Sequence, residues 1–130
     1  MATIKERFKL KADELSEEIK EILKEHGNKK IGEVSLSQVY QGMRGITGLV
    51  TETSLLDSQE GIRFRGYTIP ELQEKLPKAP NGTEPLPEGL LYLMLIGNLP
   101  TAEDVQHVTN VLQRRSHVPK YVFEAIDALP

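Results

Sequence analysis

The sequence predicts a mainly α-helical protein with one small β-hairpin. Apolar residues recur at steps of three or four along residues 3–26 and again in segments between residues 68 and 130, which is the periodicity of helices. Between them, residues 42–66 combine closely spaced glycines with two short strand-like runs. We therefore expect a long N-terminal amphipathic helix, a glycine-rich turn with the hairpin, and then four helices.

The long N-terminal helix is predicted over residues 3–26. Its apolar side chains form one stripe, while Lys and Glu occupy the other faces. The stripe consists of Ile4, Phe8, Ala12, Leu15, Ile19 and Ile22. Gly27 and Asn28 supply a stop signal. A stripe of this length needs an apolar partner surface, either in this chain or on another.

The glycine-rich region follows a short predicted helix, Leu36 to Tyr40, for which Ser35 is the expected N-cap. Glycines at positions 42, 45 and 48 then interrupt regular structure. The hairpin is predicted from two runs, 52–56 and 62–64, joined by a turn that ends at Gly61. Strand alternation would place Arg63 and Arg65 on one face of the second run.

Four helices are predicted after the hairpin. The first begins at Thr68 and runs to about Leu76, and a proline-rich loop over 77–87 follows it. Residues 88–96 are apolar almost all round, so this helix should be buried. The third helix opens at Thr101, and its predicted buried side consists of Val105, Val108, Val111 and Leu112. The fourth covers 121–129.

Composition excludes several classes of protein. Apolar residues make up 38% and charged residues 27% of 130 residues, a balance typical of a single globular domain. The net charge of −3 favours neither nucleic acid nor an anionic membrane as a partner. The chain has no cysteine, which excludes disulfides and thiolate metal sites. No apolar run is long enough to span a bilayer, and no secretory signal is recognisable, so we expect any targeting sequence to be missing or removed.

Arg44, flanked by Gly42 and Gly45, is the most suggestive candidate for a binding residue. Glycines let a backbone approach a ligand closely, and a guanidinium offers a planar fork of donors suited to phosphate. The pattern is equally compatible with a structural turn held by a salt bridge. Arg63 and Arg65 are better explained structurally, as arginines that tie the hairpin to carboxylates such as Glu52, Asp57 or Glu60.

The histidines favour neither catalysis nor metal binding. Acid–base chemistry needs a histidine held near a second titrating group, and a metal site needs clustered ligands. His26 and His117 are predicted at helix ends, and His107 lies off an apolar stripe. We therefore expect no catalytic residue and no metal site among these 130 residues.

Several longer motifs, taken in order, resemble one family. They are GMRG at 42–45, EGIRFRGYTIPE at 60–71, PLPEGLLYL at 85–93 and GNLPTAEDV at 97–105. The resemblance runs from about His26 to Pro130, and over this range the chain is similar to the leading part of citrate synthases. The long first helix and the proline-rich loop are similar to those of the mitochondrial type. One departure is Gln41, which stands where relatives usually have a second glycine.

The resemblance implies a mainly α-helical, dimeric enzyme that condenses acetyl-CoA with oxaloacetate to give citrate and CoA. Residues 1–130 would be the N-terminal segment of its large domain, and Arg44, with Gly42 and Gly45, would lie at the coenzyme A phosphates. Acetyl-CoA would be a substrate, and no cofactor would be tightly bound. The family's two catalytic histidines and its aspartate come later in the chain than the matched motifs.

The favoured hypothesis is therefore a segment inactive by itself, whose partner is the remainder of a citrate synthase supplied as a separate chain, in the mitochondrial matrix. Two alternatives remain open: a non-catalytic structural or assembly protein derived from the family, and a truncated fragment.

Overall fold

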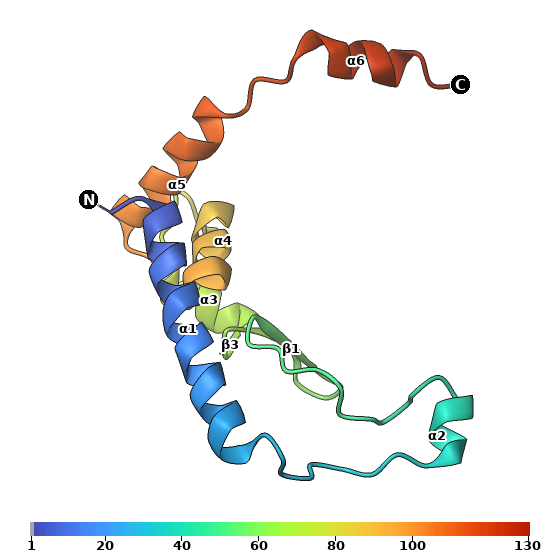
Figure 1. Cartoon of the computed structure of the whole chain (residues 1–130). Coiled ribbons are helices and arrows are strands. Elements are labelled where there is room, and N and C mark those ends of the chain that lie inside the picture. Colours follow the sequence, from blue (N-terminus) through green and yellow to red (C-terminus); the bar gives the residue numbers. More distant parts are fainter. Residues whose placement is uncertain (1) are drawn as a thin grey trace.

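The structure is a computed structural model that describes residues 2–130. It is mainly helical with a small antiparallel sheet, as the sequence predicts (Figure 1). In chain order the elements are α1 (Ile4–His26), α2 (Leu36–Tyr40), β1 (Ser54–Asp57), β2 (Gly61–Phe64), β3 (Tyr67–Thr68), α3 (Ile69–Lys75), α4 (Pro87–Ile96), α5 (Ala102–Arg114) and α6 (Lys120–Asp127). The four helices expected after the hairpin are all present.

Helix α1 agrees with the predicted span of residues 3–26 and ends at the predicted stop, Gly27. Thr3 and Glu6 form a capping box, in which each side chain accepts a hydrogen bond from the other residue's backbone N–H. Most of the predicted apolar stripe is nevertheless exposed: Phe8 is 48%, Ile19 46% and Ile22 51% accessible. The chain itself therefore covers this stripe only in part: Ile4 packs against the core and Leu15 is half-buried.

The sheet contains the predicted hairpin and one strand more. β1 pairs with β2 from Ser54 opposite Phe64 to Asp57 opposite Gly61, and β3 adds two residues on the far side of β2. Arg65 and Gly66 link β2 to β3 with φ angles of 48° and 87°. Two consecutive positive φ values are typical of the tight hairpin turns that suit the twist of strands. Arg65 thus lies in a turn, and the expectation that it shares a strand face with Arg63 is wrong.

The core lies between α3, α4 and α5. One cluster consists of Leu72, Leu76 and Leu93, and a second consists of Tyr92, Ile96 and Val108. The prediction that α4 is buried all round is only half right. Its other face carries Leu91 and Leu95, which are 39% and 36% accessible.

Helix α5 shows the same contrast between one buried and one open region. Val105 and Val108 are buried as predicted, whereas Leu112 is 47% accessible, because the second half of α5 extends past α4 (Figure 1). Periodicity indicates that a side chain lies on the apolar face of a helix, but it does not show whether another element covers that face.

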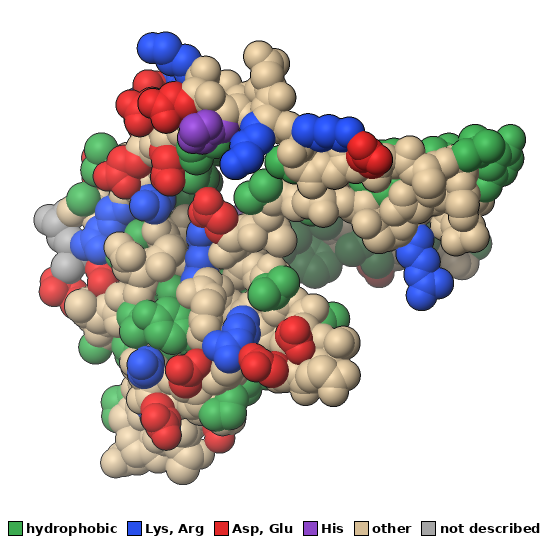
Figure 2. Space-filling view, turned by 90° about the horizontal axis from the view of Figure 1, so that it is seen from below, with side chains coloured by type: hydrophobic (Ala, Val, Ile, Leu, Met, Phe, Trp, Pro, Cys, Tyr) green, Lys and Arg blue, Asp and Glu red, His purple; other side chains and the backbone are tan. Residues whose placement is uncertain are grey.

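The overall shape is open. Residues 27–53 form an arm that carries α2 away from the body, and α6 stands apart at the other end (Figure 1). No residue of α2 or α6 is buried. Seen from below, the arm projects to the right with hydrophobic side chains gathered at its tip (Figure 2). The accessible surface is 10844 Å², whereas a compact protein of this mass exposes about 6,900 Å².

Candidate functional site

The glycine-flanked Arg44 follows directly from the end of α2. Ser35 and Gln38 form a capping box that starts this five-residue helix. After it, the backbone N–H of Met43 donates to the carbonyl of Gln38 at 2.8 Å, and the Gln38 side chain donates to the carbonyl of Arg44 at 3.4 Å. Gln38 thus fastens the turn to the helix from both its backbone and its side chain.

The turn needs a left-handed backbone at three positions. The φ angles are 76° at Gly42, 61° at Met43 and 73° at Gly45. Glycine adopts such angles without the Cβ clash that other residues suffer. A Cβ on Gly42 would meet nothing within 4 Å, and on Gly45 only the Gln38 amide at 3.9 Å. Conformation, and not lack of space, therefore requires these glycines, and the turn backbone is open to an approaching molecule.

Gln41 does not disturb this turn. Its φ of −91° and ψ of 20° lie in a region open to any residue, so a glycine is not required there. The departure from the usual pattern of the family is compatible with the same turn geometry.

The Arg44 guanidinium has no partner among residues 2–130. Its side chain is exposed, and within the described chain it forms neither a hydrogen bond nor an ion pair. The structural alternative, a turn held by a salt bridge of Arg44, is therefore not what this chain forms. An uncommitted guanidinium beside an open backbone can bind an anion through several N–H groups at once.

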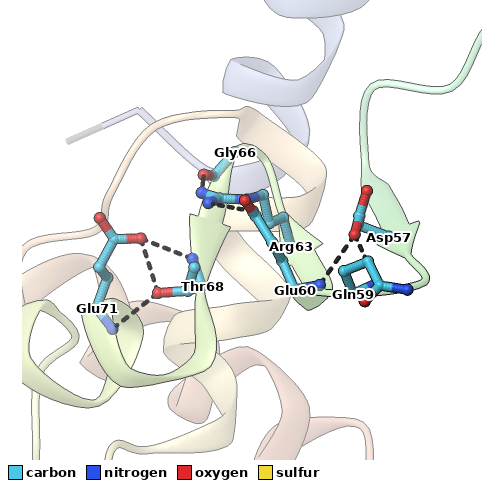
Figure 3. A network of polar contacts seen from close by, with 7 residues as sticks. All are labelled: Asp57, Gln59, Glu60, Arg63, Gly66, Thr68 and Glu71. Carbon is cyan, nitrogen blue, oxygen red and sulfur yellow. Dashed lines mark hydrogen bonds and ion pairs between the residues drawn. The ribbon is translucent and has the colours of Figure 1, made fainter.

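Arg63, in contrast, is fully engaged in the hairpin. Its guanidinium donates to the Glu60 carboxylate at 2.8 Å and to the Gly66 carbonyl at 3.0 Å (Figure 3). The neighbouring turn is closed by Asp57, whose carboxylate accepts from the backbone N–H groups of Gln59 and Glu60. Those bonds, chiefly the one from Glu60, hold the pKa of Asp57 below its usual value.

Arg65 ties the sheet to α4. It donates to the Met94 carbonyl at 2.9 Å and pairs with Glu52 at 3.2 Å. Its side chain is only 16% accessible. The structural reading of both hairpin arginines is thus confirmed, with Glu60 and Glu52 as the partners and Asp57 as part of the turn.

Arg7 joins three helices in a polar cluster that the sequence did not reveal. It donates to the Tyr92 hydroxyl at 2.6 Å and pairs with Asp104 at 2.9 Å. Burial acts to raise the pKa of Asp104, but the hydrogen bonds from Thr101 and the charge of Arg7 outweigh it and leave this pKa below normal. We name Arg7, Tyr92 and Asp104 the α1 clamp, since it fastens α1 to α4 and α5.

The histidines lie far from one another in the chain and in different settings. His26 is exposed beside Glu25, with 3.8 Å between Nε2 and the carboxylate, and His117 is exposed in the α5–α6 connection. His107 is half-buried, and its Nε2 is shielded from solvent without a hydrogen-bond partner. The sequence places His107 beside an apolar stripe, but it does not reveal whether the ring nitrogens of a single histidine have hydrogen-bond partners.

Neither a cluster of metal ligands nor a membrane-spanning helix is present in the described part of the chain. Residues 2–130 contain no group of three or more His, Asp or Glu side chains placed to hold a metal ion. Among the helices of this same stretch, none is long and apolar enough to cross a bilayer.

The chain belongs to the citrate synthase family. The family model described as "Citrate synthase, C-terminal domain" matches residues 42–130. The chain is 54% identical over 128 residues to "Citrate synthase, mitochondrial" of Saccharomyces cerevisiae and 53% identical to that of Aspergillus niger, in each case across 98% of this chain. It is also 54% identical over 127 residues to "2-methylcitrate synthase, mitochondrial" of Yarrowia lipolytica. The chain spans 27% of the length of each of these relatives.

Proposed function

We propose that this chain is a segment of a citrate synthase and takes part in condensing acetyl-CoA with oxaloacetate to give citrate and CoA. The observation that carries the proposal is the 54% identity to a mitochondrial citrate synthase across 98% of the chain. In this proposal residues 1–130 are the N-terminal segment of the enzyme's large domain. The segment is inactive alone, because the family's catalytic histidines and aspartate lie on the remainder.

Arg44 is the residue of this segment proposed to touch substrate. Its role would be to bind the phosphates of acetyl-CoA, with Gly42 and Gly45 keeping the backbone open beside them. Two features support this: the guanidinium is uncommitted within residues 2–130, and the positive φ angles of both glycines are built into the turn. Acetyl-CoA is then a substrate that enters and leaves, and the segment holds no permanent cofactor.

The remainder of the enzyme is the proposed partner, as a separate polypeptide, and the completed unit is proposed to form a dimer. The surface supports a large apolar interface. Exposed apolar side chains lie on α1, α2, α4 and α6, including Phe8, Tyr40, Leu91 and Phe123. The accessible surface of 10844 Å² is more than one and a half times the roughly 6,900 Å² of a compact protein of this mass. Much of the apolar surface is therefore available for a partner to cover.

The mitochondrial matrix is the proposed compartment, because the relatives named above are mitochondrial proteins by their descriptions. The similarity to a 2-methylcitrate synthase equals that to the yeast citrate synthase, so this segment does not discriminate between the two products. A condensation assay should therefore score both citrate and 2-methylcitrate.

Native mass spectrometry of the protein purified from its source, with peptide identification of every bound chain, tests the proposal. We expect a partner in equal amount that carries the family's two histidines and aspartate, and a complex that forms citrate. The chain found by itself, or bound only to proteins unrelated to citrate synthase, would contradict the proposal and leave a structural role or a truncated fragment.

A further inference from the structure

A cavity between the first turn of α1 and the second half of α5 lies apart from the Arg44 turn. Its volume is about 410 Å³, and its walls include Ile4, Lys5, His107, Val111, Arg114 and Arg115. Three of these side chains are cationic and come from two different helices. We propose that this cavity is a binding site for a small oxyanion of the phosphate class.

The charge of the cavity walls is the first argument. Within residues 2–130, Lys5, Arg114 and Arg115 form no ion pair, so no carboxylate directly offsets their charges at this cavity. Like charges gathered at one concave surface repel one another and concentrate counter-ions there. A bound anion with two or more charges would offset that repulsion.

Two carboxylates lie on the same helical turns as residues of the cavity, and neither pairs with Lys5, Arg114 or Arg115. Glu6, in the first turn of α1, is engaged by the backbone N–H and hydroxyl of Thr3. Asp104, one turn before His107 on α5, is engaged by Arg7 and Thr101. Glu6 keeps its charge, because Thr3 is neutral, but neither carboxylate forms an ion pair with the three cations of the cavity.

The position of the two arginines has a partial explanation without a ligand. Cations at the C-terminal end of a helix interact favourably with its carbonyl groups, and Arg114 ends α5. That effect does not account for Lys5. This lysine lies in the first turn of α1, and a cation at the N-terminal end of a helix is unfavourable. A shared anionic ligand accounts for all three.

His107 provides the second argument. Its ring lines the cavity, and its Nε2 has no hydrogen-bond partner in the described chain. A polar atom that is shielded from solvent and has no partner is unfavourable, so a bond from an arriving ligand would stabilise it. Rotation of the ring by 180° exchanges Nε2 with a carbon at nearly the same position, so a nitrogen can be turned toward an arriving anion.

A phosphate titration followed by NMR of the His107 ring tests the site. The 130-residue chain is used together with any polypeptide that copurifies with it, and ionic strength is held constant with chloride. We expect saturable shifts of the His107 ring signals with inorganic phosphate. Pyrophosphate should bind about tenfold more tightly, because its additional charges meet three cations. Absence of a saturable shift with either anion would overturn the proposal.

Variants separate this cavity from other basic positions. Both arginines are exposed, so Arg114→Gln with Arg115→Gln should leave the fold intact by circular dichroism and weaken pyrophosphate binding at least about tenfold. Lys29→Gln removes an exposed cation from the arm and should change the affinity less than about twofold. Equal losses in both variants would overturn the site in favour of non-specific screening.

Arg44→Gln identifies the competing location. Unchanged pyrophosphate affinity in Arg44→Gln supports the cavity as the binding site. If Arg44→Gln loses binding while Arg114→Gln with Arg115→Gln retains it, the anion binds at the glycine turn and the proposal is overturned. The outcome does not depend on the condensation reaction, so the cavity and the proposed function can fail independently.

Discussion

Arg44 differs from Arg7, Arg63 and Arg65 in having no bond to the described chain. Those three arginines hold the fold together through carboxylates, carbonyls or a hydroxyl. Because its guanidinium is exposed and unbonded within residues 2–130, Arg44 is available to bind an anion, which supports the proposed contact with acetyl-CoA.

Replacing Arg44 by Ala tests the proposed contact with acetyl-CoA. A hydrogen bond to a charged group contributes about 1.5–3 kcal/mol, so the KM for acetyl-CoA should rise roughly ten- to a hundredfold with kcat little changed. Steady-state kinetics of the completed enzyme, with each substrate varied in turn, measure this. An equal rise in the KM for oxaloacetate would show that Arg44 is structural.

Replacing Gly45 by Ala tests whether the turn geometry itself matters. Alanine at a φ of 73° is strained by about 1–2 kcal/mol although nothing crowds its Cβ, so the turn should open and affinity for acetyl-CoA should fall. Gly48 has no positive φ and open space around it, so Gly48→Ala is the matched control. Isothermal titration with CoA compares the two, and identical affinities would show that the left-handed turn is dispensable.

At the scale of elements, the α1 clamp determines where the long helix lies. Apolar contacts alone cover little of α1, since only its beginning reaches the core. The bonds of Arg7 to Tyr92 and Asp104 therefore supply much of the orientation of this helix relative to α4 and α5.

Tyr92→Phe removes one bond of the clamp and keeps the ring in the core. We expect α1 to exchange its amide hydrogens faster, while α4 and α5 stay protected, with a loss of about 1 kcal/mol in unfolding free energy. Tyr92→Asp should instead prevent folding or association, because it buries a charge at a position only 5% accessible. Unchanged α1 exchange in Tyr92→Phe would show that the hydroxyl contributes nothing.

The clamp also predicts a pH dependence. The pKa of Asp104 is lower in the folded than in the unfolded chain, where it is about 3.9. As pH falls below that value, the unfolded state takes up the proton first, so the stabilisation by Asp104, complete at neutral pH, is lost. Urea unfolding should show Asp104→Asn to be about 1–3 kcal/mol less stable at pH 7, with the difference shrinking below pH of about 4. A difference independent of pH would contradict this.

At the scale of the whole molecule, the open shape leaves much apolar surface exposed, which supports the proposal that the remainder of the enzyme completes the fold. A compact chain of this length has a radius of gyration of about 14 Å. The arm with α2 and the separate α6 depart from such a compact form, since both helices stand away from the body and neither has a buried residue (Figure 1).

Helix α6 offers a test of that completion. Phe123→Glu with Ile126→Glu places charges on its apolar face, where both residues are more than half exposed, and should abolish association with the remainder without changing the helical content of the chain. Glu124→Gln alters the polar face of the same helix and serves as the control. Native mass spectrometry reads both, and unimpaired association of the double variant would show that α6 is not part of the interface.

Much of this protein follows from local sequence alone. Capping residues such as Thr3, Ser35, Thr68 and Thr101 start four of the helices where predicted, because the interactions that begin a helix lie within four residues. The glycines of the Arg44 turn also behave as expected, since φ is a property of single residues. The turn at Arg65 and Gly66 was missed because a non-glycine residue occupies its first left-handed position.

The sequence by itself determined the family, the helices, the hairpin and the turn that presents Arg44. Only the tertiary structure decided which apolar residues are covered, that Arg63 and Arg65 have different partners, and that Arg7 reaches across 85 residues to Tyr92. The reason is physical: capping and backbone conformation act over a few residues, whereas burial and charge pairing depend on which distant segment arrives beside a side chain. That is why the apolar faces of α1 and α4 could be recognised in the sequence, but not their exposure.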